Sequence, residues 1–319
     1  GQIRRQRQMC IRDRYLARQA VESGSADCVL ALGFEQMRPG ALGDIYTDRP
    51  SPFGEFNDTC EQLVGNSHIP LALRYFGGAG KSHMDKYGTT MKDFAKIRAK
   101  ASRHASKNPL ALFKKEVSEE EVLNSPIMWP GVMTRLMACP PTCGGAAAIL
   151  VSEKFAKKHN IDASVKILAQ SMTTDYESTF AEKDMMQLVG YDMTKEAARD
   201  VYHQTGVDVQ DVDVVELHDC FAHNELITYE ALGLCEEGEA QKFVHDGNNT
   251  FGGKFVTNPS GGLLSKGHPL GATGLAQCFE LTQQLRGNAG EKQVEGAKTA
   301  LQHNLGLGGA CVTTLYQTI

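Results

Sequence analysis

The sequence predicts an α/β protein of two lobes, the first of which is interrupted by an insertion of helices and loops. Three observations support this fold class. The chain has 319 residues, more than one ordinary domain core needs. Short apolar runs typical of strands alternate with helical patterns in both halves. Residues 45–137, inside the first lobe, are polar and irregular, with short helical stretches. One large α/β unit is the alternative.

Composition narrows the functional classes. Hydrophobic residues make up 41% of the chain and charged residues 22%, as in globular proteins, and no apolar run is long enough to span a membrane. A net charge of -5 argues against general nucleic-acid binding. Nine scattered cysteines favour a reducing compartment without disulfides. Cys139 and Cys143 have no partner pair at ligand spacing, so we predict small buried residues and no zinc site.

The first lobe begins after an unusual segment. Residues 1–14, GQIRRQRQMCIRDR, hold five arginines and no apolar pattern, and we interpret them as foreign to the domain. A cloning or assembly artefact or a wrong exon explains them better than a basic targeting arm. From Tyr15 the sequence predicts the end of a helix and then a buried strand, ADCVLALGFEQM. We therefore predict a partial first domain at 15–160 that contains the insertion.

The core pattern resumes after the insertion. TCGGAAAILV predicts a glycine-opened buried strand, followed by a helix that Ser152 caps. The second domain, 161–319, is predicted to start with the strand VKILAQSM. A helix over 195–205 is predicted to be capped by Thr194 and stopped by Gly206. Two strands joined by a glycine turn, KTALQHN and GACVTTLY, are predicted to end the chain.

The clearest chemical signal is the segment 258–274, NPSGGLLSKGHPLGATG. Five glycines allow tight turns, and Pro269 suits the first turn of a helix that runs to Arg286. We expect this to hold His268 at a helix N-terminus, where the dipole lowers its pKa and favours a neutral ring that accepts protons. The sequence thus predicts a general base. The alternative is a histidine that only completes the turn.

This segment resembles the signature loop of thiolases, which reads GG followed by GHPxGxxG. VDVVELHDCFAHNELITYEALGL, from residue 212, resembles the HDCF form found in sterol-carrier-protein-type thiolases. QHNLGLGGACVTTLY, from residue 302, is similar to the end of that subfamily. The resemblance covers Tyr15 to the C-terminus. It implies the thiolase fold, two similar βαβαβαββ lobes with an inserted helix and loop lobe, and here a first lobe that is incomplete.

The resemblance also implies site residues. Cys220 would be the acid/base that acts at the acetyl-CoA α-carbon, with a thiol pKa near neutral that His218 and His268 tune. His218 would hold a water in the oxyanion hole, and the backbone N–H of Gly306 would serve the second oxyanion hole. The alternative for Cys220 is an ordinary buried cysteine. His223 to Glu225 are predicted to be surface or packing residues.

Two departures from the family follow. The nucleophilic cysteine is expected at the position of Arg7, so Cys10 is three residues out of register, and we interpret it as coincidental. The chain is therefore predicted to lack the nucleophile region and to be inactive as written. Cys143 and Gly144 stand where the family generally has Ser-Asp before GAAA. Because the Asp is absent, any hydrogen bond that its side chain makes in the family is lost here, but the strand that follows it is still expected.

The implied function is thiolytic cleavage of 3-oxoacyl-CoA through an acyl-cysteine, with coenzyme A as substrate and no metal or redox cofactor. Family members dimerise, and the expected compartment is the peroxisome, although the chain carries no signal for it; the cytoplasm or mitochondrion are the alternatives. A ketoacyl synthase of the same fold is disfavoured. Such enzymes usually have the motifs GHxxGAAG and NSFGFGGxN, whereas this chain has HPLGATG and HNLGLGG. A catalytically silent lipid-binding or interaction protein is the rival from another class.

Overall fold

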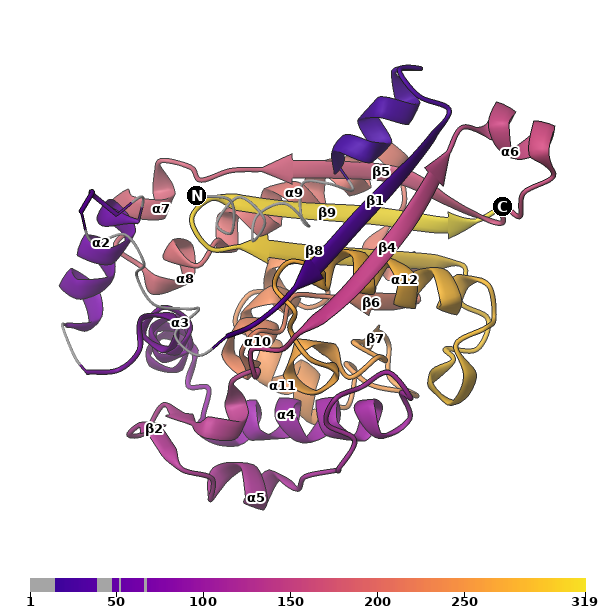
Figure 1. Cartoon of the computed structure of the whole chain (residues 1–319). Helices are drawn as coiled ribbons and strands as arrows, with labels where there is room; N and C mark the ends of the chain where they lie inside the picture. The colour runs from indigo at the N-terminus through magenta and orange to yellow at the C-terminus, as the bar shows by residue number, and fades with distance from the viewer. Residues whose placement is uncertain (1–14, 39–47, 52, 66–67) are drawn as a thin grey trace.

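The structure is a computed structural model that describes residues 15–38, 48–51, 53–65 and 68–319. Figure 1 shows a large sheet and a smaller two-stranded sheet, with helix α12 (Thr273–Leu285) between them. The helix packs against β6 (Val214–Glu216) and β8 (Thr299–Gly306) of the large sheet and against β1 (Cys28–Glu35) and β4 (Gly144–Val151) of the small one. None of the helices in these residues is long and apolar enough to cross a membrane.

The large sheet forms the second lobe and has the strand order β5-β9-β8-β6-β7. Its strands are β5 (Val165–Thr173), β6 (Val214–Glu216), β7 (Val256–Thr257), β8 (Thr299–Gly306) and β9 (Ala310–Thr318). The predicted first strand and terminal strand pair are confirmed. Because β6 runs parallel to both β7 and β8, the segments that follow these three strands leave the sheet at the same edge. The HDCF and glycine-loop motifs are two of these segments.

Helix α9 (Tyr191–Thr205) packs on β5 and β9. It ends at Gly206, as predicted, because this residue takes the left-handed conformation that stops a helix. Its predicted start was wrong: the helix begins four residues before Lys195, with Gly190 at the cap position. Thr194 is buried inside the helix, where its hydroxyl contacts His303 instead of capping.

The small sheet pairs β1 (Cys28–Glu35) with β4 (Gly144–Val151) in antiparallel register, although the insertion separates them in sequence. Both strands were predicted to be buried, and this was wrong for one face. Leu30, Leu32 and Phe34 are 61%, 58% and 59% exposed. The inner face, which includes Ala31, packs on Leu275 of α12. The apolar run identified the strands correctly, but nothing among the described residues covers their outer face.

The insertion is mostly helical and joins the core of the second lobe. Helix α4, which a capping box at Thr90 and Asp93 starts, is buried along most of its length. It packs against α10, and so does α3. The elements of the insertion and the remaining helices are α2 (Gly54–Val64), α3 (Leu71–Tyr87), α4 (Met91–Ser106), α5 (Glu119–Leu123), β2 (Ile127–Trp129), β3 (Met133–Thr134), α6 (Glu153–His159), α7 (Ser178–Ala181), α8 (Met185–Leu188), α10 (Ala222–Ala231) and α11 (Ala240–His245). Ser152 caps α6, as predicted.

Candidate active site

The two motifs meet where β6 and β7 end. The backbone N–H of Leu217 donates to the Asn258 side-chain oxygen (2.8 Å), and the N–H of Asn258 donates to the Val215 carbonyl (2.7 Å). These bonds fix the start of one motif against the start of the other. The imidazole rings of His218 and His268 then lie edge to face, with centroids 5.1 Å apart. The structure therefore brings together two predicted site residues that are 50 positions apart in sequence.

His268 is held in one tautomer. Its Nδ1 lies 2.8 Å from the Thr273 hydroxyl oxygen, and that hydroxyl donates its single hydrogen to the Pro269 carbonyl at 3.0 Å. The hydroxyl oxygen consequently accepts a hydrogen bond from Nδ1–H. This leaves Nε2 of His268 without a proton, as a general base requires.

The predicted reason for a neutral His268 was wrong. Helix α12 begins at Thr273, so Pro269 precedes the helix and His268 is not at its N-terminus. The pKa of His268 is nevertheless lowered well below its ordinary value. Burial is the largest cause, and the neighbouring His218 and Lys266 add to it. The ring is neutral because it is desolvated between other potential cations.

His218 is a second neutral ring, because burial lowers its pKa to about 3. Its carbonyl accepts a hydrogen bond from the Asn224 side chain at 2.6 Å, and its backbone N–H donates to Nδ1 of His303 at 3.4 Å. Nε2 of His303 therefore carries the proton and donates to the Thr194 hydroxyl, 3.1 Å away. Nδ1 of His218 itself is buried and has no hydrogen-bond partner among the described residues.

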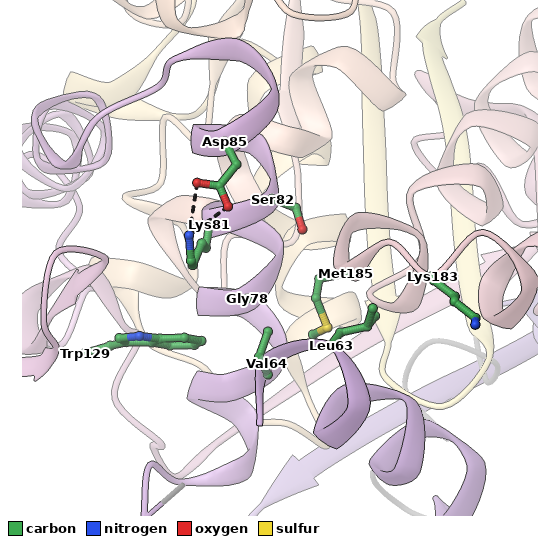
Figure 2. Close-up of a pocket in the computed structure, with 9 residues that line it drawn as sticks. All are labelled: Leu63, Val64, Gly78, Lys81, Ser82, Asp85, Trp129, Lys183 and Met185. Carbon is green, nitrogen blue, oxygen red and sulfur yellow. Dashed lines mark hydrogen bonds and ion pairs between the residues drawn. The ribbon is translucent and has the colours of Figure 1, made fainter. Parts of the chain in front are cut away.

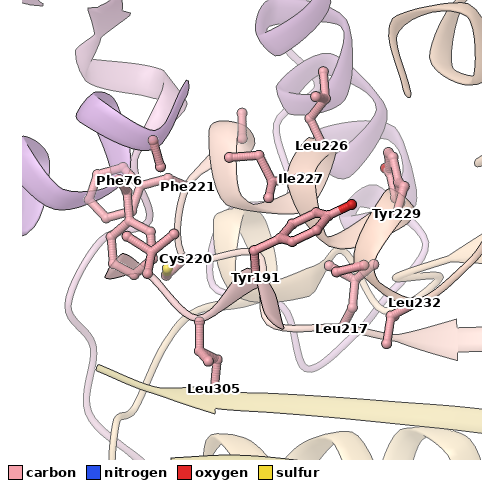
Figure 3. Packing of buried hydrophobic residues seen from close by; sticks show 14 of the residues in the cluster. Phe76, Tyr191, Leu217, Cys220, Phe221, Leu226, Ile227, Tyr229, Leu232 and Leu305 are labelled. Carbon is pink, nitrogen blue, oxygen red and sulfur yellow. The ribbon is translucent and has the colours of Figure 1, made fainter. Parts of the chain in front are cut away.

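Cys220 lies within the hydrophobic core, and Figure 3 shows its thiol below the paired rings of Phe76 and Phe221. These rings stack with centroids 4.9 Å apart. Burial raises the pKa of Cys220 well above its ordinary value, and the nearby Cys139 and Asp219 raise it further. The expectation of a thiol pKa near neutral is thus wrong. A thiol in this setting is protonated at neutral pH, which suits a proton donor.

The end of the insertion closes over both motifs. Ala138 forms an antiparallel bridge with Phe221, and Pro141 forms a parallel bridge with His268. The N–H of Cys139 donates to the Cys220 carbonyl at 2.9 Å. No sequence motif predicts this contact, since the segment lies about 80 residues from one motif and 130 from the other. Gly306, the remaining predicted site residue, ends β8 opposite Ala310.

Some expectations for neighbouring residues need correction. Cys139 is half-buried, but Cys143, which was predicted to be buried, is exposed, and its Sγ accepts a hydrogen bond from the N–H of Met37. His223 and Glu225 were predicted to be surface or packing residues, and their complete burial confirms the packing alternative. The predicted position of the nucleophile, Arg7, and the neighbouring Cys10 lie outside the described residues.

A pocket of about 280 Å³ lies elsewhere, along the outer face of α3, as Figure 2 shows. Gly78 forms its floor, and Trp129 and Met185 form walls. The opposite face of α3 carries Phe76, which stacks on Phe221 of the HDCF motif. Helix α3 therefore separates this pocket from the histidine pair. The pocket contains none of the predicted site residues.

Residues 174–316 match the family described as thiolase C-terminal domain-like. The chain is 55% identical over 305 residues to sterol carrier protein 2 of Oryctolagus cuniculus, covering 95% of the chain and 55% of that protein. It is 44% identical to non-specific lipid-transfer protein-like 2 of Caenorhabditis elegans, covering 95% of the chain and 74% of that protein. It is 35% identical to acetyl-CoA acetyltransferase of Methanothermobacter thermautotrophicus, covering 93% and 74%.

Solved structures agree on the fold. The Ltp2-ChsH2(DUF35) aldolase superposes with a TM-score of 0.80 at 22% identity, covering 97% of this chain and 77% of that one. The dimeric peroxisomal thiolase of Saccharomyces cerevisiae superposes with a TM-score of 0.68 at 19% identity, covering 97% and 74%. The chain belongs to the thiolase family and has the thiolase fold. Within that family its relatives include sterol carrier protein 2, of whose length it spans about half.

Proposed function

We propose that this chain carries the acid–base and oxyanion machinery of a thiolase that cleaves 3-oxoacyl-CoA with coenzyme A. The observation that supports this best is the pair of buried neutral histidines: His268 offers an unprotonated Nε2 beside the ring of His218. A desolvated base next to a second polar ring suits acyl transfer from a thioester, in which a thiol must lose its proton and an oxygen gains charge. The acetyl-CoA acetyltransferase relative supports the same reaction class.

In the proposed cleavage, His268 takes the proton of a nucleophilic cysteine, and the thiolate attacks the C3 carbonyl of 3-oxoacyl-CoA. The C2–C3 bond breaks, and its electron pair stays on C2. The Cys220 thiol protonates this carbanion, which leaves as acetyl-CoA, or propionyl-CoA from a branched substrate. The Cys220 thiolate takes the thiol proton of a second coenzyme A, whose thiolate attacks the acyl-cysteine and releases the shortened acyl-CoA, and the departing cysteine thiolate recovers its proton from the His268 imidazolium. No metal or redox cofactor takes part in this proposal.

The charge that develops on oxygen needs donors. We assign one to His218, whose unpartnered polar ring atom is available to a water or a substrate oxygen. We assign the other to the backbone N–H of Gly306. His218 follows β6 and Gly306 ends β8, and these parallel strands end at the same edge of the sheet as β7, the strand before His268. Donors built on strand ends are held rigidly, which is what oxyanion stabilisation requires.

The proposed reaction also needs a nucleophilic cysteine, and the proposal does not assign this role to any cysteine of the chain. We propose that the chain as written does not catalyse thiolysis, because Cys10 stands in an arginine-rich segment and out of register with the position of Arg7. We also propose a homodimer and a peroxisomal location. The dimeric peroxisomal yeast thiolase and the sterol carrier protein 2 relative support these two proposals.

The decisive experiment measures proton exchange, which needs Cys220 and the oxyanion donors. The chain is incubated with acetyl-CoA in D2O, and deuterium at the α-carbon is followed by mass spectrometry. Exchange that His218→Ala removes would support the proposal. The proposal would be refuted if exchange were absent in two proteins: the chain itself, and a version whose residues 1–14 are replaced with the preceding segment of rabbit sterol carrier protein 2. Binding of a fluorescent fatty acid without exchange would favour the rival, a silent lipid-binding protein.

A further inference from the structure

Asp219 stands between the two proposed site residues of the HDCF motif and is fully buried. Its carboxylate faces the other motif. Oδ1 accepts the backbone N–H of Leu263 at 2.7 Å, and Oδ2 accepts that of Leu264 at 3.3 Å. These two amides belong to the π-helical turn Gly262–Lys266, and His268 follows two residues after its end. Asp219 therefore connects the segment that carries Cys220 directly to the loop that carries the base.

We infer that Asp219 is a positioning residue that fixes the His268 loop against His218 and Cys220, an inference that rests on the proposed thiolase function. A carboxylate is the side chain that offers two strong acceptors to two successive amides. The same turn has no other side chain from the HDCF motif bonded to its backbone among the described residues. Loss of these bonds releases the loop at a point four and five residues before the base.

The glycine of the turn is matched to this carboxylate. Gly262 has a φ of +59°, and a Cβ placed on it would lie 2.0 Å from Oδ2 of Asp219. Any larger residue would push the carboxylate off the two amides. The glycine thus serves the approach of Asp219 and not only the turn. This pairing argues that the contact between the two motifs is specific.

A second restraint acts on the same turn from the insertion. Nη1 of Arg98, on α4, donates to the Ser265 hydroxyl at 2.7 Å. The Arg98 guanidinium is buried and interacts electrostatically with Asp219. Burial, with Glu225 adding to the effect, raises the pKa of Asp219 above its ordinary value, while the two backbone N–H bonds and Lys100 lower it and so favour the carboxylate. The turn is therefore held by the Asp219 carboxylate on its backbone and by the Arg98 guanidinium on the Ser265 side chain.

The test compares two buried carboxylates. Asp219→Asn keeps the side-chain shape but turns an amide NH2 toward one of the two backbone N–H groups. We expect acetyl-CoA exchange per folded molecule to fall about 10- to 100-fold, because the released loop no longer holds the His268 ring against His218 beside Cys220, and displacement of a catalytic group by about 1 Å has an effect of this size. KM should change less than about threefold, because the substrate is not contacted. The control is Glu230→Gln, which weakens a buried carboxylate bonded to the N–H of Ala240 (3.1 Å) and should leave the rate unchanged.

Two further measurements keep the outcome decisive. The 15N resonances of the His268 ring report its tautomer whether or not the chain exchanges protons. If the wild-type chain is inactive but Asp219→Asn still shifts these resonances, the proposed function fails and the role of Asp219 stands. Ser265→Ala, a milder variant, should lower exchange about 3- to 10-fold through the same loop. The inference would be overturned if folded Asp219→Asn kept wild-type exchange and unshifted His268 resonances. It would also be overturned if Glu230→Gln lost as much exchange as Asp219→Asn.

Discussion

Replacing Thr273 by valine tests how the base is prepared. The hydroxyl of Thr273 accepts from Nδ1–H of His268 and donates to the Pro269 carbonyl. Valine keeps the shape of threonine but removes both bonds. The Nδ1–H would then be a buried donor without an acceptor, which costs about 1–3 kcal/mol. The ring relieves this cost by moving the proton to Nε2, and His268 then loses the lone pair that makes it a base.

The size of the effect follows from that cost. Each 1.4 kcal/mol changes the ratio of the two tautomers about tenfold, so the productive tautomer should fall roughly 10- to 100-fold. Acylation should slow by the same factor, because the other tautomer does not accept the proton of the nucleophile. We would measure the tautomer by 15N spectroscopy of the chain itself. The acyl-enzyme burst with acetoacetyl-CoA would be measured in the version that carries the N-terminal segment of rabbit sterol carrier protein 2.

The same helix provides the control. Thr282 also donates its hydroxyl to the carbonyl four residues back, that of Cys278, at 2.7 Å. Thr282→Val therefore removes a comparable helix bond without touching the site. Thr273→Ser should retain most activity, because it retains the hydroxyl. If Thr273→Val left Nε2 unprotonated and the burst unchanged, Nδ1 would find its acceptor elsewhere, and our assignment of the tautomer would be refuted.

Three more predictions follow from the site and its surroundings. In the version that carries the N-terminal segment of rabbit sterol carrier protein 2, His268→Ala should abolish the acyl-enzyme burst, whereas Cys220→Ser should spare the burst and slow α-proton exchange about a hundredfold; normal exchange would make Cys220 an ordinary core residue. Burial lowers the pKa of His104 to about 3, so this ring contributes stability above about pH 6.5 that is lost at about 1.4 kcal/mol per pH unit as the pH falls. His104→Gln should therefore flatten the acid side of a stability-pH curve, whereas exposed His159→Gln should not. Cys10→Ala should leave α-proton exchange by the chain unchanged, and thiolysis by the chain that Cys10→Ala removes would identify Cys10 as the nucleophile.

The second lobe was predictable because most residues of its central strands β6, β8 and β9 are buried on both faces. Such strands appear as uninterrupted apolar runs, and β5, β8 and β9 lie where those runs predict them. In the first lobe the same reasoning failed. The run that contains Leu30 and Leu32 is as apolar as a buried strand, yet one face of β1 is exposed. An apolar run shows that both faces of a strand can be buried, but it does not show which residues cover them.

The motifs that carry the site residues could be predicted from the sequence, but the residues that hold them in place by hydrogen bonds could not. His268, His218 and Cys220 stand in segments with a distinctive spacing of glycine, histidine and cysteine. Asn224 and Thr273 carry no such signal, because one polar residue in a helix is compatible with many roles. Their function depends on which backbone or ring atom comes within 3 Å, and long-range packing determines that distance. The helix-dipole explanation for His268 failed for the same reason: sequence did not fix where α12 begins.

The insertion has a larger role than its irregular sequence indicated. Helix α4 bonds to the segment that follows β7 and precedes His268: Lys100 contacts Thr257, and Nδ1 of His104 donates to the Asn258 carbonyl at 2.9 Å. A Cβ on Gly261 would lie 2.5 Å from that of Ala105, so the glycine loop rests directly on this helix. Apart from the π-helical turn Gly262–Lys266, the loop takes its shape from α4 below and from the HDCF segment beside it. An insertion that supplies one of these two supports is part of the framework of the proposed site, and substitutions in α4 should therefore alter proton transfer before they alter acyl-chain preference.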